Sequence, residues 1–148
     1  MDALKNGFLR AETEFKKVAE SVEPVNRSGS CAIVVLIIDR NCFVANVGDS
    51  RAIMSIEHGR RTIALSNDHK PNCSSEKSRI ESNGGSIYQS MITTKSGMSI
   101  PGPFRVSPGR LSVSRAIGDI QAKDEKYEGL PGVLISDPEI TSFEIRPE

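Results

Sequence analysis

The feature that most constrains the fold is a pair of apolar segments separated by a very short turn. The stretch "SCAIVVLIIDRN", residues 30–41, holds an unbroken run of β-branched and aliphatic residues, and "CFVANVGD" follows it directly. A continuous apolar run of this kind is typical of a strand buried on both faces. Because Asp39, Arg40 and Asn41 supply the turn, the two segments are predicted to form a β-hairpin at the centre of the fold.

Further strands are expected on both sides of this hairpin. The segments "SRAIMSIEHG" and "RRTIALSND" follow it and meet at the turn His58-Gly59. With links this short, the strands between about residues 29 and 67 are predicted to form an antiparallel meander. The alternating residues of "DPEITSFEIRPE" favour a last strand, so that residues 109–148 return to the sheet.

Two helices and one irregular segment complete the organisation. An amphipathic helix over residues 2–20 is predicted by a stripe of apolar side chains at helical spacing, Leu4, Phe8, Ala11, Phe15 and Val18. The segment "SSEKSRIESNGG" predicts a second helix over about 74–83. Between 86 and 108, Gly, Ser, Thr, Met and Pro dominate without a firm period, and an irregular excursion is expected. These elements indicate one α+β domain.

Composition excludes several classes of partner. The 148 residues carry 19 basic and 19 acidic side chains without a long run of either sign, which argues against a nucleic acid or an anionic membrane as partner. The longest apolar run, "CAIVVLII", is far shorter than the ~20 residues that span a bilayer. Three cysteines without C-x-x-C spacing favour a reducing compartment, so a soluble protein of the cytoplasm or nucleus is expected.

Three acidic turns are candidates for chemistry. Each follows an apolar segment and has a basic neighbour: Asp49 with Arg51, Asp68 with Lys70, and Asp119 with Arg115. Any one of them has an ordinary structural explanation, since Asp and Gly are common at strand ends. Three together suggest a cluster at one end of a sheet, where Mg²⁺ or Mn²⁺ would relieve the repulsion between carboxylates. Pairing of the carboxylates with the arginines is the alternative.

His69, directly after Asp68, is a weaker candidate. It could act as a general acid or a metal ligand, but it has no partner histidine at ligand spacing, and a hydrogen-bonded structural role is the simpler interpretation. The sequence contains neither a phosphate-binding glycine loop of known pattern nor a G-x-S-x-G nucleophile elbow.

Six phrases in order resemble the middle of the metal-dependent Ser/Thr protein phosphatases of type 2C. They are "SGSCAIVVLI", "CFVANVGDSRAIM", "LSNDHKP", "EKSRIESNGGSI", "GRLSVSRAIGD" and "ISDPEI". The corresponding family patterns read approximately G-S-T-A, V-A-N-x-G-D-S-R, D-H-K-P, E-x-x-R-I-x-x-x-G-G, L-A-V-S-R-A-x-G-D and P-E-I/V. Each phrase alone is weak, but the ordered set covers about residues 28–140.

The resemblance implies a fold and several residue roles. The fold would be an antiparallel β-sandwich flanked by helices, present here as an incomplete central portion. Asp49 and Arg51 would form a positioned polar pair near the cleft, and Arg115 and Asp119 would likewise be structural. Asp68 would be a ligand of an additional metal ion. Residues 86–108 would be the family's flap, which lies beside the cleft and affects substrate choice.

Departures from the family pattern limit what the segment is expected to do alone. The E-D pair, D-G-H-G-G, D-G-x-x-D and D-N phrases that hold the two principal metal ions are missing, as is the early phosphate-binding arginine; no "DG" or "DN" dipeptide occurs. The chain is expected to begin just after D-G-H-G-G and to stop just before D-G-x-x-D. Cys31 replaces the usual threonine of G-S-T-A, with an expected small loss of hydrogen bonding.

The leading interpretation is therefore a segment of an enzyme. In the whole enzyme, two Mg²⁺ or Mn²⁺ ions would activate a water that attacks phosphoserine or phosphothreonine in a phosphoprotein substrate. No principal catalytic residue is expected within the 148 residues, which should be inactive alone and should self-associate through exposed strand edges. The alternatives are a non-catalytic, phosphatase-like binding or regulatory module, and an unrelated β-rich domain with acidic turns.

Overall fold

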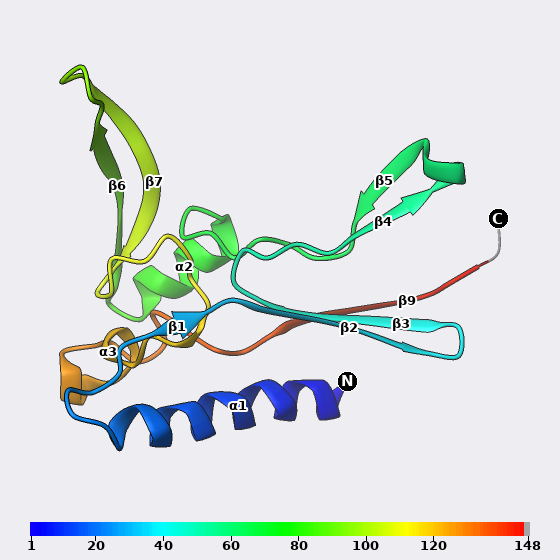
Figure 1. The fold of residues 1–148 in the computed structure, drawn as a ribbon, viewed down its shortest axis with the longest axis horizontal. Coiled ribbons are helices and arrows are strands. Elements are labelled where there is room, and N and C mark those ends of the chain that lie inside the picture. The colour runs from blue at the N-terminus through cyan, green and yellow to red at the C-terminus, as the bar shows by residue number, and fades with distance from the viewer. Residues whose placement is uncertain (147–148) are drawn as a thin grey trace.

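The structure, a computed structural model, describes residues 1–146. Its largest sheet is antiparallel, with the strand order β2 (Ala32–Ile38), β3 (Asn41–Val47) and β9 (Glu139–Glu144). Helix α1 (Asp2–Glu20) runs along this sheet (Figure 1). The mixture of helices and antiparallel strands confirms the predicted α+β class.

The first helix and the central hairpin form as the residue pattern predicts. In α1, Leu4 and Phe8 of the predicted stripe face the sheet, where Phe8 is buried against Ala45 and Val47. Ala11 and Val18 of the same stripe are exposed, and Ala19 is buried instead. The hairpin pairs β2 with β3 so that Ala32 lies opposite Val47. Its reversal uses Asp39, whose φ of 53° is tolerated by aspartate better than by a β-branched residue.

The predicted burial of the apolar run on both faces is wrong for β2. Val35 and Ile37 of β2 are 49% and 57% exposed, whereas β3 carries the buried side chains Cys42, Val44 and Val47. The reason is that β3 lies between two strands, while β2 is at the edge of the sheet that residues 1–146 form. An exposed apolar edge strand is a template for association, and self-association stays a prediction.

The predicted four-strand meander is also wrong. β4 (Ile53–Ile56) and β5 (Arg61–Ala64), linked by the short helix η1 (Glu57–Gly59), pair only with each other and project as a separate arm (Figure 1). The second neighbour of β3 is β9, which comes from the far end of the chain. Gly48, at a φ of +100°, marks the place where the chain leaves the sheet.

The segment expected to be irregular is a regular hairpin. β6 (Ser86–Thr93) and β7 (Ser99–Ser107) pair from Ser86–Ser107 to Thr93–Ser99, with a register shift between Gln89 and Met91. Pro101 and Pro103 are tolerated in β7 because prolines fit an edge strand whose other side has no ladder. The β6–β7 hairpin follows α2 (Ser74–Ser82), and Ile87 packs against Ile80, Val106 and Val133.

Short elements complete the described chain. β1 (Gly29–Ser30) pairs with β8 (Ile117–Gly118), and α3 (Ile120–Lys123) and η2 (Glu125–Tyr127) follow. Ala116, Ala122 and Leu134 form a further small core here. No helix within residues 1–146 is long and apolar enough to cross a membrane.

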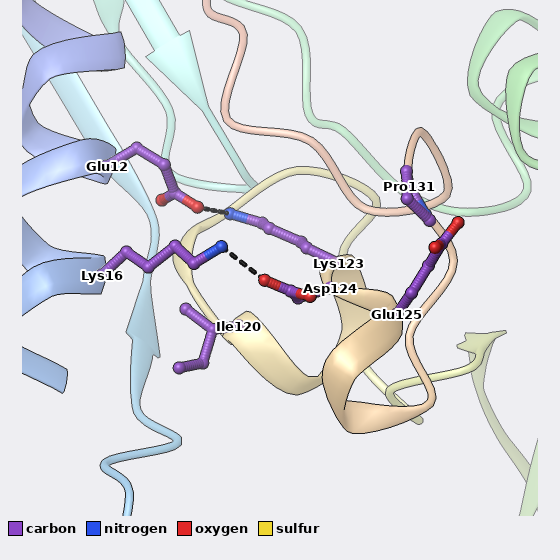
Figure 2. Close-up of a pocket in the computed structure, with 7 residues that line it drawn as sticks. All are labelled: Glu12, Lys16, Ile120, Lys123, Asp124, Glu125 and Pro131. Carbon is purple, nitrogen blue, oxygen red and sulfur yellow. Dashed lines mark hydrogen bonds and ion pairs between the residues drawn. The ribbon is translucent and has the colours of Figure 1, made fainter. Parts of the chain in front are cut away.

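Ion pairs dock α1 on this last region. A hollow of about 390 Å³ lies between α1 and residues 120–131. Glu12 with Lys123 and Lys16 with Asp124 cross it, as Figure 2 shows. Nζ of Lys123 donates to Oε1 of Glu12 at 2.6 Å, and Oε2 of Glu12 accepts from the Gly118 N–H at 2.7 Å. Burial lowers the pKa of Lys123, although Glu12 opposes the effect. We call the two pairs that cross the hollow, Glu12 with Lys123 and Lys16 with Asp124, the latch between α1 and residues 120–131.

Replacing Glu12 by glutamine tests this latch. The variant leaves the largely buried ammonium of Lys123 without its carboxylate, so the free energy of unfolding in urea is expected to fall by about 3 kcal/mol. The matched control is Glu14→Gln on the same helix, which breaks an exposed pair with Lys17 and should cost less than about 1 kcal/mol. Equal losses in the two variants would contradict the latch.

Candidate functional site

Two of the three predicted acidic turns come together next to the sheet. The first turn, residues 48–51, follows β3, and the second, residues 67–70, follows β5. His69 N–H donates to the Gly48 carbonyl at 3.0 Å, and Gly48 N–H donates to Nδ1 of His69 at 3.1 Å. Asn46, buried in β3, donates from Nδ2 to the Asn67 carbonyl at 2.8 Å. These bonds fix the turns side by side.

The charges of the two turns are paired crosswise. Arg51 of the first turn grips Asp68 of the second with two hydrogen bonds, Nε to Oδ1 at 2.9 Å and Nη2 to Oδ2 at 2.8 Å. Lys70 of the second turn in return donates to Asp49 of the first. The hydrogen bond from Arg51 lowers the pKa of Asp68, and that from Lys70 lowers the pKa of Asp49. Both carboxylates are ionised at neutral pH.

The structure identifies the partners of two predicted site residues. Asp49 and Arg51 were expected to be a positioned polar pair near the cleft, and each of them binds the opposite turn. A guanidinium fork needs a carboxylate facing it in one plane, and Asp68 meets this requirement. We call these four residues the crossed pairs: Arg51 with Asp68 and Lys70 with Asp49.

Cys31 adds a contact to the first turn. Its Sγ donates to Oδ1 of Asp49 at 3.3 Å, and burial raises the pKa of the thiol, which keeps its proton at neutral pH. Cys31 thus keeps a hydrogen bond here, and because S–H is a weak donor the expected small loss relative to threonine stays a prediction. A side chain at Gly48 would collide with this sulfur, so glycine is required there for its close approach as well as for its φ.

His69 supports the turns structurally. Its side chain is buried, and burial lowers its pKa, so the ring is neutral at pH 7. Because Nδ1 accepts from Gly48, the proton resides on Nε2, which lies 3.5 Å from Oε2 of Glu139 and has no closer partner within residues 1–146. This geometry matches the hydrogen-bonded role weighed for His69.

Asp119 lies apart from the crossed pairs. It begins α3 at a φ of 50°, and burial raises the pKa of its carboxyl group. Its carboxylate is pressed against β1, where a Cβ on Gly29 would overlap with it. The predicted three-carboxylate cluster is wrong for the described residues, because no three His, Cys, Asp or Glu side chains gather in a way that could hold a metal ion there.

Arg115, the third basic neighbour, binds Glu76 rather than Asp119. Its Nη2 donates to Oε1 of Glu76 at 2.7 Å, and Oε2 accepts from the Ser114 hydroxyl at 2.6 Å and from Arg79 Nη2 at 2.8 Å. The Glu76 side chain is only 4% exposed. Burial alone would raise its pKa, but the bonds from Arg115, Ser114 and Arg79 prevail and hold the pKa at about 2.

The Glu76 network reaches the crossed pairs through one backbone bond. Ser114 N–H donates to the His69 carbonyl at 2.9 Å, so the residue between Asp68 and Lys70 is tied to the segment that Glu76 holds. Arg115 Nη1 also donates to the Asp137 carbonyl at 2.9 Å, just before β9. The buried carboxylate of α2 therefore positions the second turn.

Glu76 supports the site, although local patterns in the sequence do not mark it as a site residue. The available signal was Arg79 three residues later, within the phrase E-x-x-R-I, since a Glu–Arg pair at this spacing lies on one helix face. Its bonds to Ser114 and Arg115 join residues 38 and 39 positions apart, which no local pattern reveals.

The donor set does not by itself fit a Mg²⁺ or Mn²⁺ centre. Such ions take several oxygen ligands, whereas both oxygens of Asp68 are occupied by Arg51. Asp68 does line an open hollow of about 350 Å³, together with Arg51, Ser66 and Cys73, and its side chain is 19% exposed. The Asp68 carboxylate therefore lies at the rim of this hollow, in reach of solvent, and not in a dry interior. The metal role of Asp68 stays a prediction.

Comparison with known proteins gives a consistent result. The family model described as Protein phosphatase 2C matches residues 1–148. The chain is 37% identical over 145 residues to "Probable protein phosphatase 2C 27" of Arabidopsis thaliana, covering 97% of this chain and 32% of that protein. It is 31% identical over 144 residues to "Protein phosphatase 1A" of Bos taurus, covering 97% and 33%. The chain thus spans about a third of the length of these relatives.

Solved structures share the fold. A serine-threonine phosphatase 2C from Toxoplasma gondii aligns with a TM-score of 0.68 at 22% identity, covering 99% of this chain and 46% of that one. A sex determining protein of C. elegans aligns with a TM-score of 0.71 at 24% identity, covering 98% and 30%. At these identities the match speaks for the fold alone.

Removing each cation in turn tests the crossed pairs. Because the bond from Arg51 is the main cause of the low pKa of Asp68, that pKa is expected to rise in Arg51→Ala. Lys70→Ala should instead raise chiefly the pKa of Asp49. Carboxyl-carbon NMR shifts followed through an acid titration report both groups. A rise confined to Asp49 in Arg51→Ala would show that the pairing is within each turn and not crossed.

Proposed function

This chain belongs to the protein phosphatase 2C family, and on that premise we propose that it forms the central part of a domain that hydrolyses phosphoserine and phosphothreonine esters in proteins. The observation that carries the proposal is the match of the family model to all 148 residues. The substrates are accordingly phosphoproteins, as in a protein phosphatase generally.

The proposed cofactor of the whole domain is Mg²⁺ or Mn²⁺. The family is generally metal-dependent, and a divalent ion supplies an activated water for attack on phosphorus. The residues described here do not make that centre, so its principal ligands must come from other chain segments. We assign this chain the framework beside the metals, with Asp68 as the ligand of an additional ion.

The chain's own residues then act by positioning. The crossed pairs neutralise two carboxylates at the rim without an ion, so the turns hold their shape before any metal arrives. The Glu76 network anchors the second turn to the rest of the chain through Ser114 and His69. With no metal cluster of its own among residues 1–146, the isolated chain is proposed to be inactive.

A non-catalytic, phosphatase-like module is the second candidate. The observation that favours it is the bidentate pairing of Asp68 with Arg51, which already neutralises this carboxylate without a metal ion. Such a module would keep the fold and the crossed pairs but would never assemble a metal centre. The two candidates differ in what the framework does when the missing ligands are supplied.

A chimera separates them. The segment of bovine protein phosphatase 1A that matches this chain is replaced by residues 1–148, and phosphate release from a phosphothreonine peptide is measured with Mn²⁺. We expect Mn²⁺-dependent release by the chimera and none above background by the isolated chain. Unmodified phosphatase 1A is the positive control, and circular dichroism verifies folding.

Two outcomes would count against the proposal. A chimera that folds like phosphatase 1A and melts cooperatively, yet releases no phosphate, would favour the non-catalytic module. Metal-dependent release by the isolated 148 residues would show that the chain assembles a centre from its own side chains.

A further inference from the structure

The β6–β7 hairpin has two faces of different character. On one face the cross-strand pair Ile87 and Val106 packs into the core with Ile80. The next cross-strand pair, Tyr88 and Arg105, points the opposite way because side chains alternate along a strand. Figure 1 shows the hairpin as a curved arm that extends beyond α2. Because Ile87 and Val106 face the core, the face with Tyr88 and Arg105 lies away from it.

A groove runs along the outward face. It measures about 630 Å³ and is lined in part by Tyr88, Ser90, Ile92, Arg105 and Arg110. The register shift at Ser90 bends the strands, and the Ser90 hydroxyl donates to the Pro103 carbonyl at 2.9 Å, which fixes the bend. Tyr88 is 37% exposed and Ile92 48% exposed, so the groove offers apolar surface to a partner.

The charge of this region is one-sided. Between Glu81 and Asp119 the sequence has no acidic residue but four basic ones, Lys95, Arg105, Arg110 and Arg115, in a chain whose total charge is balanced. Arg115 is neutralised by Glu76. Arg105 and Arg110 form no ion pair within residues 1–146; Arg105 only donates from Nη1 to the Arg110 carbonyl at 2.7 Å. The groove therefore carries two arginines without counter-charges.

We propose that this groove binds an extended acidic stretch of the substrate protein, through carboxylates on Arg105 and Arg110 and apolar side chains beside Tyr88 and Ile92. This inference rests on the proposed phosphatase function and assigns it a substrate class. Guanidinium groups bind carboxylates in a planar, bidentate manner, and an aromatic ring beside them favours a mixed acidic and apolar sequence. A long polyanion fits less well, since basic and acidic residues balance over the whole chain.

The test is binding of a fluorescein-labelled, unphosphorylated peptide of alternating glutamate and leucine to the 148-residue chain, followed by anisotropy. We expect saturable binding that weakens with salt, and much weaker binding of the same peptide with glutamine in place of glutamate. Arg105→Gln and Arg110→Gln should each lower the affinity about tenfold.

Lys95→Gln is the matched control. It removes the same charge at the tip of the hairpin, outside the groove, and should change the affinity less than about twofold. Equal binding of the glutamate and glutamine peptides to the unmodified chain would overturn the proposal even if a variant failed to fold. So would an equal loss in Lys95→Gln, or stronger binding of a glutamine peptide that carries one phosphoserine.

The binding assay does not depend on hydrolysis. An active chimera combined with no peptide binding would remove this inference and leave the proposed function standing. Peptide binding combined with a folded but inactive chimera would remove the proposed function and leave an acidic-segment binding site.

Discussion

A buried carboxylate held by two arginines is the interaction on which the described structure depends. Glu76 is withdrawn from water, which costs several kcal/mol for a charge without partners. Arg79, Arg115 and the Ser114 hydroxyl offset that cost. Nη1 of Arg79 also donates to the Val133 carbonyl, and Nη1 of Arg115 donates to the Asp137 carbonyl. One side chain of α2 thereby joins two segments with little regular secondary structure, residues 114–115 and 133–137.

The hydrogen bonds of Glu76 also position the two acidic turns of the site. Ser114, which is bonded to Glu76, donates its N–H to the His69 carbonyl. His69 donates its own N–H to the Gly48 carbonyl at the end of β3 and accepts from the Gly48 N–H through Nδ1. The two acidic turns therefore lie where the sheet and the Glu76 network meet. With the crossed pairs in place, the rim carries carboxylates and cations in equal number. The two turns are therefore held in place by their own ion pairs, and the described residues form no group that could hold a metal ion.

Local patterns in the sequence predict the parts of this fold that depend on neighbouring residues. The stripe from Leu4 to Val18 predicts α1, and the β-branched run before Asp39 predicts the β2–β3 hairpin. The ordered phrases identify the family. The sequence does not reveal which strands and which charged side chains pair when they lie far apart in the chain. β3 pairs with β9 and not with β4. Arg51 forms its ion pair with Asp68, 17 residues away. Each choice is set by how the turns are oriented in space, which composition does not encode.

The most direct test of the account is the free energy of unfolding of the unmodified chain and of Glu76→Gln, measured from neutral pH down to pH 2. Because the pKa of Glu76 is lowered from 4.5 to about 2 in the folded state, its contribution is fully present above pH 4.5 and is lost as the pH falls towards 2. The stability difference between the two proteins should therefore shrink by about 3 kcal/mol over that range. A difference that stays constant with pH would contradict the central place given to this carboxylate.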